Sequence, residues 1–272
     1  DGYTTSVHAA LLCPNFTESG WALTRAPAHM TNDLRRMLLE GLEGEPELEE
    51  PGSGVEGENM PLLVDVMDLN ERILEELRPI HEAWAGVPLK SSTAFGLRVY
   101  RNDSYLGMHV DEPGTHIISS ILHVDHDEES EPWPLVVEDL QGNLQKVFLE
   151  SGDLLMYESS KCLHGRPIPF NGLWYSSMFI HYAPTDWETE KAVMDIHYRI
   201  PPGWERIVPK QDGLDELMVD ESIFNEPGCK NNWCGLRNAF DVRGSEEGVG
   251  LTRAGKGANA LGAGSDQEKK EL

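Results

Sequence analysis

The chain of 272 residues carries 47 acidic and 22 basic side chains, a formal net charge of −25, and 39% of its residues are hydrophobic. A chain of this length buries a full hydrophobic core as one domain with appendages. The charge argues against a nucleic-acid partner, because phosphate contacts need a basic footprint. No apolar run approaches the length of a membrane span, so we expect no membrane partner either.

For residues 1–90 we predict an N-terminal support region of helical and mixed secondary structure. Residues 31–40 predict a short helix capped at Thr31. Residues 43–60 form an acidic loop with seven glutamates, for which we expect mobility. For residues 63–84 we predict an amphipathic helix, because apolar side chains recur at helical spacing. We expect its apolar face to pack against the β domain as a support. These side chains are Leu69, Ile73, Leu77, Ile80 and Trp84.

Residues 91–187 predict the β domain. Runs rich in β-branched and aromatic residues alternate with turn residues, which is typical of strands. Strands at short spacing with little helix between them indicate a sandwich or a jelly-roll (double-stranded β-helix) barrel. The predicted fold is therefore mainly β, with the N-terminal helices flanking the barrel. The predicted strands lie at residues 95–100, 117–124, 152–157 and 173–182, with two more inside 131–149.

The C-terminal part divides into two zones. Residues 188–234 still carry apolar side chains and predict an extension packed on the core. From residue 235 the composition turns to Gly, Ala and charged residues, so residues 235–272 predict a disordered tail.

The segment His109-Val110-Asp111 and the later His164 predict a metal site. Two imidazoles and one carboxylate suit Fe(II), and three protein ligands leave other coordination positions open. Alternate side chains of a strand point to the same face, so His109 and Asp111 can bind one ion together. We predict that these three residues are the metal ligands and the catalytic centre.

Other interpretations of these residues remain open. His123 and Asp125 form a second pair of the same spacing, and His164 can also be an ordinary structural histidine. The acidic run 125–131 lacks the glycine and final glutamate of a calcium loop. Residues 52–57 match a dinucleotide-binding glycine pattern, but no strand precedes them and no apolar helix follows, so we reject that site.

With these motifs in place, residues 95–184, about a third of the chain, resemble the 2-oxoglutarate and Fe(II)-dependent oxygenases. The resemblance is to the branch that includes the catalytic domain of prolyl 4-hydroxylases. Tyr100 lies nine residues before His109, at the position where the family carries a tyrosine. The family carries a second tyrosine three residues before this histidine, whereas Tyr105 lies four residues before it. The resemblance implies Fe(II), 2-oxoglutarate and O₂, with ascorbate as an optional cofactor. It also implies that Tyr100 orients 2-oxoglutarate and that Tyr105 lines the substrate groove.

The chain departs from this family at one position. Trp174 stands ten residues after His164, where the family pattern has a lysine that neutralises the far carboxylate of 2-oxoglutarate. A buried dianion needs a cationic partner. We favour Arg166 for this role, with Tyr175 and Ser177 completing the 2-oxoglutarate site. Other candidates on neighbouring elements are Arg98, Arg101 and His181.

The resemblance therefore implies a dioxygenase that hydroxylates a peptide or protein substrate, with proline the best single candidate, and that releases succinate and CO₂. One alternative is an oxygenase of the same fold that acts on a free amino acid or small metabolite. The other is a non-catalytic jelly-roll binding module.

The compartment is predicted from short signals. Asn15 and Asn102 stand in glycosylation sequons, and Cys229 and Cys234 can form a local disulfide. The last residues, 269–272, resemble an endoplasmic-reticulum retrieval tail. We expect the secretory pathway or the lumen of the endoplasmic reticulum, with the cytoplasm as the alternative.

Overall fold

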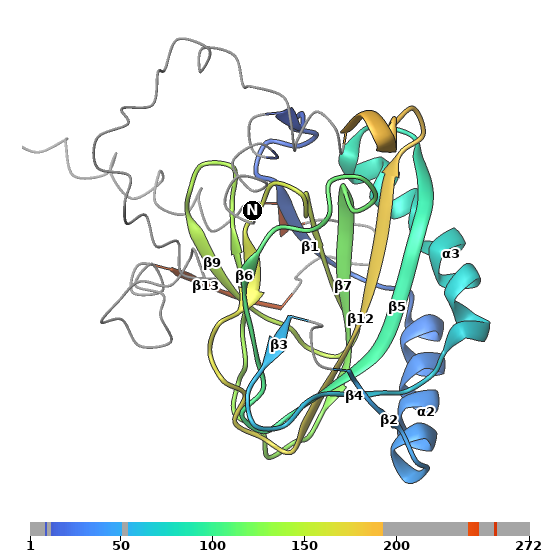
Figure 1. The fold of residues 1–272 in the computed structure, drawn as a ribbon, viewed down its shortest axis with the longest axis vertical. Helices are drawn as coiled ribbons and strands as arrows, with labels where there is room; N and C mark the ends of the chain where they lie inside the picture. Colours follow the sequence, from blue (N-terminus) through green and yellow to red (C-terminus); the bar gives the residue numbers. More distant parts are fainter. Residues whose placement is uncertain (1–8, 10–11, 51–53, 193–238, 245–252, 255–272) are drawn as a thin grey trace, which may run out of the picture.

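Two β-sheets packed face to face, with helices α2 (Ala28–Glu43) and α3 (Met67–Ala85) outside one of them, form the fold of the described residues (Figure 1). The computed structural model describes residue 9 and residues 12–50, 54–192, 239–244 and 253–254. The predicted jelly-roll barrel with flanking helices is confirmed by this two-sheet arrangement.

The larger sheet has eight strands in the order β14-β1-β10-β7-β12-β5-β4-β2. Its strand β1 comes from the N-terminal region and pairs antiparallel with β10, so the barrel also draws on the first 90 residues. The long strands β5 and β12 pair antiparallel through most of their length. The bounds are β1 Trp21–Arg25, β2 Glu47–Leu48, β4 Leu62–Leu63, β5 Leu89–Arg101, β7 Ile118–His126, β10 Asp153–Tyr157, β12 Trp174–Pro184 and β14 Arg253–Ala254.

The smaller sheet has six strands in the order β13-β9-β8-β11-β6-β3. The strand β13 pairs parallel with β9 and falls inside the segment from residue 235 for which the sequence predicts disorder. That prediction is wrong at β13, because Val242 is buried against the barrel core. The bounds are β3 Val55–Glu56, β6 Tyr105–His109, β8 Leu135–Glu138, β9 Leu144–Phe148, β11 His164–Arg166 and β13 Phe240–Arg243.

Both predicted N-terminal helices are present, with shifted ends. Helix α2 spans Ala28–Glu43 and follows Pro27, so Thr31 lies buried inside it and does not cap it. Helix α3 spans Met67–Ala85 and ends at Gly86, whose φ of 71° is left-handed and suits glycine. None of the described helices is long and apolar enough to cross a membrane.

Two apolar layers hold these elements together. The outer layer joins the helices to the larger sheet and contains Leu34, Leu38, Ile73, Leu77, Val99, Met156 and Ile180. The inner layer lies between the sheets and contains Trp21, Leu23, Ile121, Val137, Leu155 and Tyr157. Because the outward side chains of β5 bury against α3, the inward side chains of the same strand face the barrel interior.

The acidic loop at residues 43–60 is anchored rather than free. Its strand β2 pairs with β4, and its strand β3 pairs with β6. The side chain of Glu49 is buried and bonds to Arg98 at 2.5 and 2.8 Å. These contacts correct the expectation of mobility for the described part of the loop, which leaves out residues 51–53.

Some predictions fall outside the described residues. These are the extension beyond Ala192, the Cys229–Cys234 pairing and most of the C-terminal tail. The remaining cysteines, Cys13 and Cys162, are buried free thiols.

Candidate metal centre

Strand pairing brings the two predicted histidine ligands together. His109 is the last residue of β6 and His164 the first of β11, and the two are directly opposed in the antiparallel register. Asp111 lies just beyond β6, where its N–H donates to the Ser159 carbonyl at 2.9 Å. The strand therefore ends before Asp111, and this hydrogen bond rather than strand alternation holds the carboxylate beside the imidazoles.

The ligand atoms of these three residues all lie within 4.8 Å of one another. Asp111 Oδ1 is 3.5 Å from both His109 Nε2 and His164 Nε2. Charge-assisted hydrogen bonds are shorter, roughly 2.7–2.9 Å. The open spacing of one oxygen and two nitrogens fits a cation placed between them.

The backbone sets the tautomer of both imidazoles. His109 Nδ1 lies 2.9 Å from the Gly107 carbonyl, and His164 Nδ1 lies 2.9 Å from the Cys162 carbonyl. A carbonyl only accepts, so each Nδ1 carries the proton and each Nε2 keeps its lone pair. Fixing a ligand imidazole through its other nitrogen is the usual arrangement around a bound metal.

The charges within the triad support the same interpretation. Burial alone would raise the pKa of Asp111, but His164 and His109 outweigh it and hold that pKa well below its usual range. The carboxylate is therefore ionised at neutral pH. Its other oxygen, Oδ2, is buried and has no hydrogen-bond partner among the described residues.

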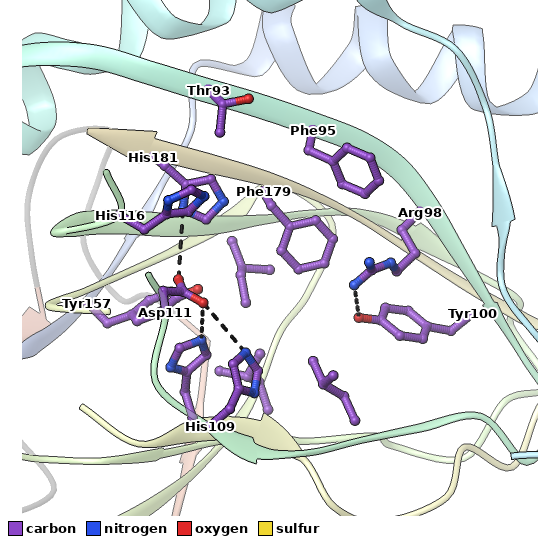
Figure 2. A pocket seen from close by; sticks show the side chains of 14 residues that line it. Thr93, Phe95, Arg98, Tyr100, His109, Asp111, His116, Tyr157, Phe179 and His181 are labelled. Atoms are coloured by element: carbon purple, nitrogen blue, oxygen red, sulfur yellow. Dashed lines mark hydrogen bonds and ion pairs between the residues drawn. The ribbon is translucent and has the colours of Figure 1, made fainter. Parts of the chain in front are cut away.

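Behind Asp111 lies a directed chain of hydrogen bonds. Ser159 Oγ donates to the His116 carbonyl at 2.7 Å, so it accepts from Ser119 Oγ at 2.6 Å. Ser119 in turn accepts from His181 Nδ1 at 2.8 Å. His181 Nδ1 lies 3.8 Å from Asp111 Oδ2, and Figure 2 shows this contact as a dashed line. Burial lowers the pKa of His181 to about 3, so it is neutral and cannot supply the missing positive charge.

The triad lies on the wall of a cavity of about 340 Å³ between the two sheets. Figure 2 shows Asp111 and His109 at one end of this cavity and Arg98 with Tyr100 at the other. Arg98 Nη1 donates to the Tyr100 hydroxyl at 3.4 Å. The lining residues are Thr93, Phe95, Arg98, Tyr100, Leu106, His109, Asp111, His116, Ile121, Leu135, Tyr157, His164, Phe179 and His181.

Arg98 is the cation on the cavity wall, and Arg166 is not. Arg166 lies outside the lining, with its guanidinium carbon 4.3 Å from the Trp133 ring centroid and 4.5 Å from that of Tyr175. Its Nη1 donates to the Trp133 carbonyl at 3.0 Å. Tyr175 and Ser177 are buried and also do not line the cavity.

The remaining sequence candidates point elsewhere. Arg101 Nε donates to the Met60 carbonyl at 2.7 Å. Tyr105 lies outside the cavity lining and donates from its hydroxyl to Glu56 at 2.5 Å, a contact that raises its pKa to about 12.

The rival pair is engaged in other contacts. His123 bonds through Nδ1 to the Ser176 carbonyl and through Nε2 to His126, both at 2.9 Å. Asp125 pairs with Arg35 at 2.6 Å. Both side chains of this pair therefore have other partners, whereas the ligand atoms of His109, Asp111 and His164 lie together, and the choice between the two pairs stays a prediction.

Sequence reasoning missed the residues near the cavity mouth. Thr93 and Phe95 face the cavity, and so do Arg98 and Tyr100, which means that the alternation of β5 shifts by one residue between them. Gly96 lies at the shift with a φ of 118°, a conformation that side-chain-bearing residues rarely adopt. This glycine was the available signal in the sequence.

No protein-family model and no curated protein matches the chain. Among solved structures the chain is similar to a prolyl-4-hydroxylase from Pseudomonas putida, at 14% identity over 66% of this chain and 98% of that chain, with a TM-score of 0.45. It is similar to HygX from Streptomyces hygroscopicus with nickel, 2-oxoglutarate and hygromycin B bound, at 13% identity over 62% and 84% and a TM-score of 0.46. It is also similar to an oxidoreductase of the 2OG-Fe(II) oxygenase family from Burkholderia pseudomallei, at 16% identity over 66% and 89% and a TM-score of 0.44. At these values the function has to be inferred from the side chains of the site.

Proposed function

We propose that the protein is an Fe(II)- and 2-oxoglutarate-dependent dioxygenase that hydroxylates a peptidyl substrate, with proline as the first candidate. The observation that carries this proposal is the convergence of His109 Nε2, His164 Nε2 and Asp111 Oδ1 on one point of a cavity wall. Two imidazoles and a carboxylate on one side of an ion are the donor set of non-haem iron oxygenases.

The chain supplies binding and orientation. His109, Asp111 and His164 would hold iron, with the imidazole tautomers already set by backbone carbonyls and the Asp111 charge maintained by the two histidines against its burial. When bound, iron with 2-oxoglutarate and O₂ supplies the oxidising chemistry, and the overall reaction yields succinate, CO₂ and the hydroxylated substrate. Phe95, Phe179 and the other apolar lining residues would shield the reacting groups from part of the surrounding water.

Arg98 and Tyr100 are the groups that we assign to the far carboxylate of 2-oxoglutarate. Both line the cavity away from the triad, and the Tyr100 hydroxyl remains able to donate a hydrogen bond. Arg98 stands on β5, directly opposite Ser177 of β12. The positive charge that Trp174 of β12 cannot provide would thus come from the adjacent strand.

Binding and turnover of the purified protein test the proposal. Wild-type protein should bind Fe(II) and 2-oxoglutarate under anaerobic conditions and release succinate in air when a proline-rich peptide is added. His164→Ala should lose iron binding and turnover and keep the wild-type circular dichroism spectrum, because the barrel core does not depend on this ligand.

Other results identify the alternatives. Succinate release with free amino acids and not with peptides would favour the small-metabolite oxygenase. A protein that binds neither iron nor 2-oxoglutarate would be the non-catalytic binding module. Residence in the secretory pathway stays a prediction from the sequence.

A further inference from the structure

A second concave surface lies beside the cavity, between α2, α3 and the middle of β5. This acidic groove has a volume of about 760 Å³, more than twice that of the cavity. In Figure 1 both helices lie along the outer face of the larger sheet next to β5, with β2 and β4 crossing near α2. The segment at Gly44 to Glu47 and the start of α3 form its rim.

All of the charged side chains that line the acidic groove are negative. Its lining includes Glu40, Glu45, Glu47 and Asp65 and contains no Lys, Arg or His. Glu40 is paired with Arg36 at 3.1 Å, whereas Glu45 and Glu47 form no ion pair with a described residue. Both are exposed. A concave surface with unpaired carboxylates attracts cationic groups at the range of the Debye length, about 10 Å at 0.1 M salt.

Apolar side chains are exposed within the same groove. Met67 is 75% exposed and Phe95 is 40% exposed, although most large apolar side chains of the described chain are buried. Exposed apolar side chains gathered in one hollow and rimmed by polar groups mark interaction sites.

Phe95 connects the acidic groove to the cavity, because it lines both. Figure 2 shows its ring on the cavity wall near Phe179 and Arg98, and the Phe95 and Phe179 ring centroids are 6.5 Å apart. A ligand that enters the cavity past Phe95 and continues outward therefore meets the groove. A free amino acid would not extend this far, whereas a polypeptide would.

We propose that the acidic groove binds the segment of a polypeptide substrate next to the residue that reacts, and that this segment carries Lys or Arg together with an apolar side chain. The reaction in this statement rests on the proposed function; the binding does not. The basic side chains would face Glu45 and Glu47, and the apolar one would lie against Met67 and Phe95.

Direct binding of labelled peptides tests this proposal without turnover. The probes are peptides of about twelve residues built from Lys-Leu-Pro, Gln-Leu-Pro or Glu-Leu-Pro units, with fluorescence anisotropy as the readout. Wild-type protein should bind the lysine peptide most tightly. The E45Q/E47Q variant should bind it about tenfold more weakly, the size expected for two lost charge contacts in a solvated site.

The matched control is E128Q/E129Q, which removes the same charge from exposed positions outside the groove. It should bind like the wild type. Met67→Gln should weaken all three peptides, since it removes an exposed apolar contact without disturbing the core. Added salt should reduce lysine-peptide binding to the wild type more than to E45Q/E47Q.

Equal weakening in both double variants, or no preference for the lysine peptide, would overturn the inference. A dimer that Met67→Gln dissociates would also overturn it and make a second copy of the chain the occupant. If iron and 2-oxoglutarate fail to bind while the peptide result holds, the proposed reaction is wrong and the groove stands. If they bind and the peptide result fails, only the groove inference is lost.

Discussion

At the scale of single residues, two buried arginines compete for the role of anion partner. Arg98 lines the cavity and is held by Glu49 on its far side. Burial would lower the pKa of Arg98, but Tyr100 and Glu49 raise it above its usual value, so the guanidinium stays charged. Arg166, in contrast, lies between aromatic rings behind the cavity and forms no ion pair with a described carboxylate. Arg98 and Arg166 therefore differ in whether a ligand in the cavity can reach them.

This difference gives a prediction for cosubstrate affinity. The E49Q/R98Q variant replaces the ion pair by a neutral pair and should bind 2-oxoglutarate about 10- to 100-fold more weakly, the loss expected for a hydrogen bond to a charged group. Glu49→Gln alone is the matched control and keeps the cation. Arg166→Gln should have a much smaller effect in the same anaerobic titration; a larger loss in that variant would return the role to Arg166.

At the scale of elements, the acidic loop is held on the larger sheet by a buried ion pair between Glu49 and Arg98. Glu49 reaches Arg98 with both carboxylate oxygens, and the two side chains are only 5% and 10% exposed. The Glu49 N–H also donates to the Pro61 carbonyl at 2.9 Å. The same loop supplies Glu45 and Glu47 to the acidic groove, so its anchoring determines where these charges stand.

Loss of the Glu49–Arg98 ion pair should destabilise the folded protein. Glu49→Ala leaves Arg98 buried without its partner and should lower the free energy of unfolding by about 3–5 kcal/mol. Glu47→Ala, at an exposed position of the same loop, should change it by less than about 0.5 kcal/mol. Urea unfolding followed by circular dichroism measures both, and similar values for the two variants would contradict a buried, strongly held pair.

Helix α3 carries a pH-sensitive contact with the sheet. His81 is fully buried, its Nδ1 bonds to the Leu77 carbonyl at 2.8 Å, and its ring centroid lies 4.7 Å from that of Tyr182. Burial lowers the pKa of His81 to about 4, from an ordinary value of 6.5. Between these two pH values the unfolded chain binds a proton that the folded protein does not.

The folded state should therefore lose stability as the pH falls from about 6.5 towards 4. The loss from His81 should be on the order of 3 kcal/mol, and stability is restored as the pH rises through the same window. His81→Leu should flatten this part of the pH profile of the unfolding free energy. An unchanged slope in His81→Leu would show that this imidazole is not buried in its neutral form.

At the scale of the whole molecule, the helices, the larger sheet and the smaller sheet form successive layers around the cavity (Figure 1). The three candidate metal ligands come from strands β6 and β11 of the smaller sheet and from the segment that follows β6, while Arg98, Tyr100 and Phe95 come from the larger sheet. The site therefore exists only when the two sheets pack. The acidic groove is formed on the outer side of the same strand β5 that carries these three side chains.

The sequence by itself determined the features that depend on local pattern. Strand and helix periodicity predicted β5, β7, β10, β12 and α3, because apolar spacing reports which face is buried. The chemistry of imidazole and carboxylate, with the resemblance around Tyr100, predicted His109, Asp111 and His164 as metal ligands. These inferences need only neighbours along the chain.

Only the tertiary structure decided the contacts between distant segments. The pairing of β6 with β11, the burial of Glu49 against Arg98 and the addition of β1 and β13 to the sheets join residues with no periodic relation in sequence. The shift at Gly96 turned Phe95 and Arg98 onto one face, against strict alternation. Burial and ion pairing depend on the residues that lie across the barrel. The sequence could therefore offer Arg98 only as one of several candidate cations, and the fold was needed to place it on the cavity wall.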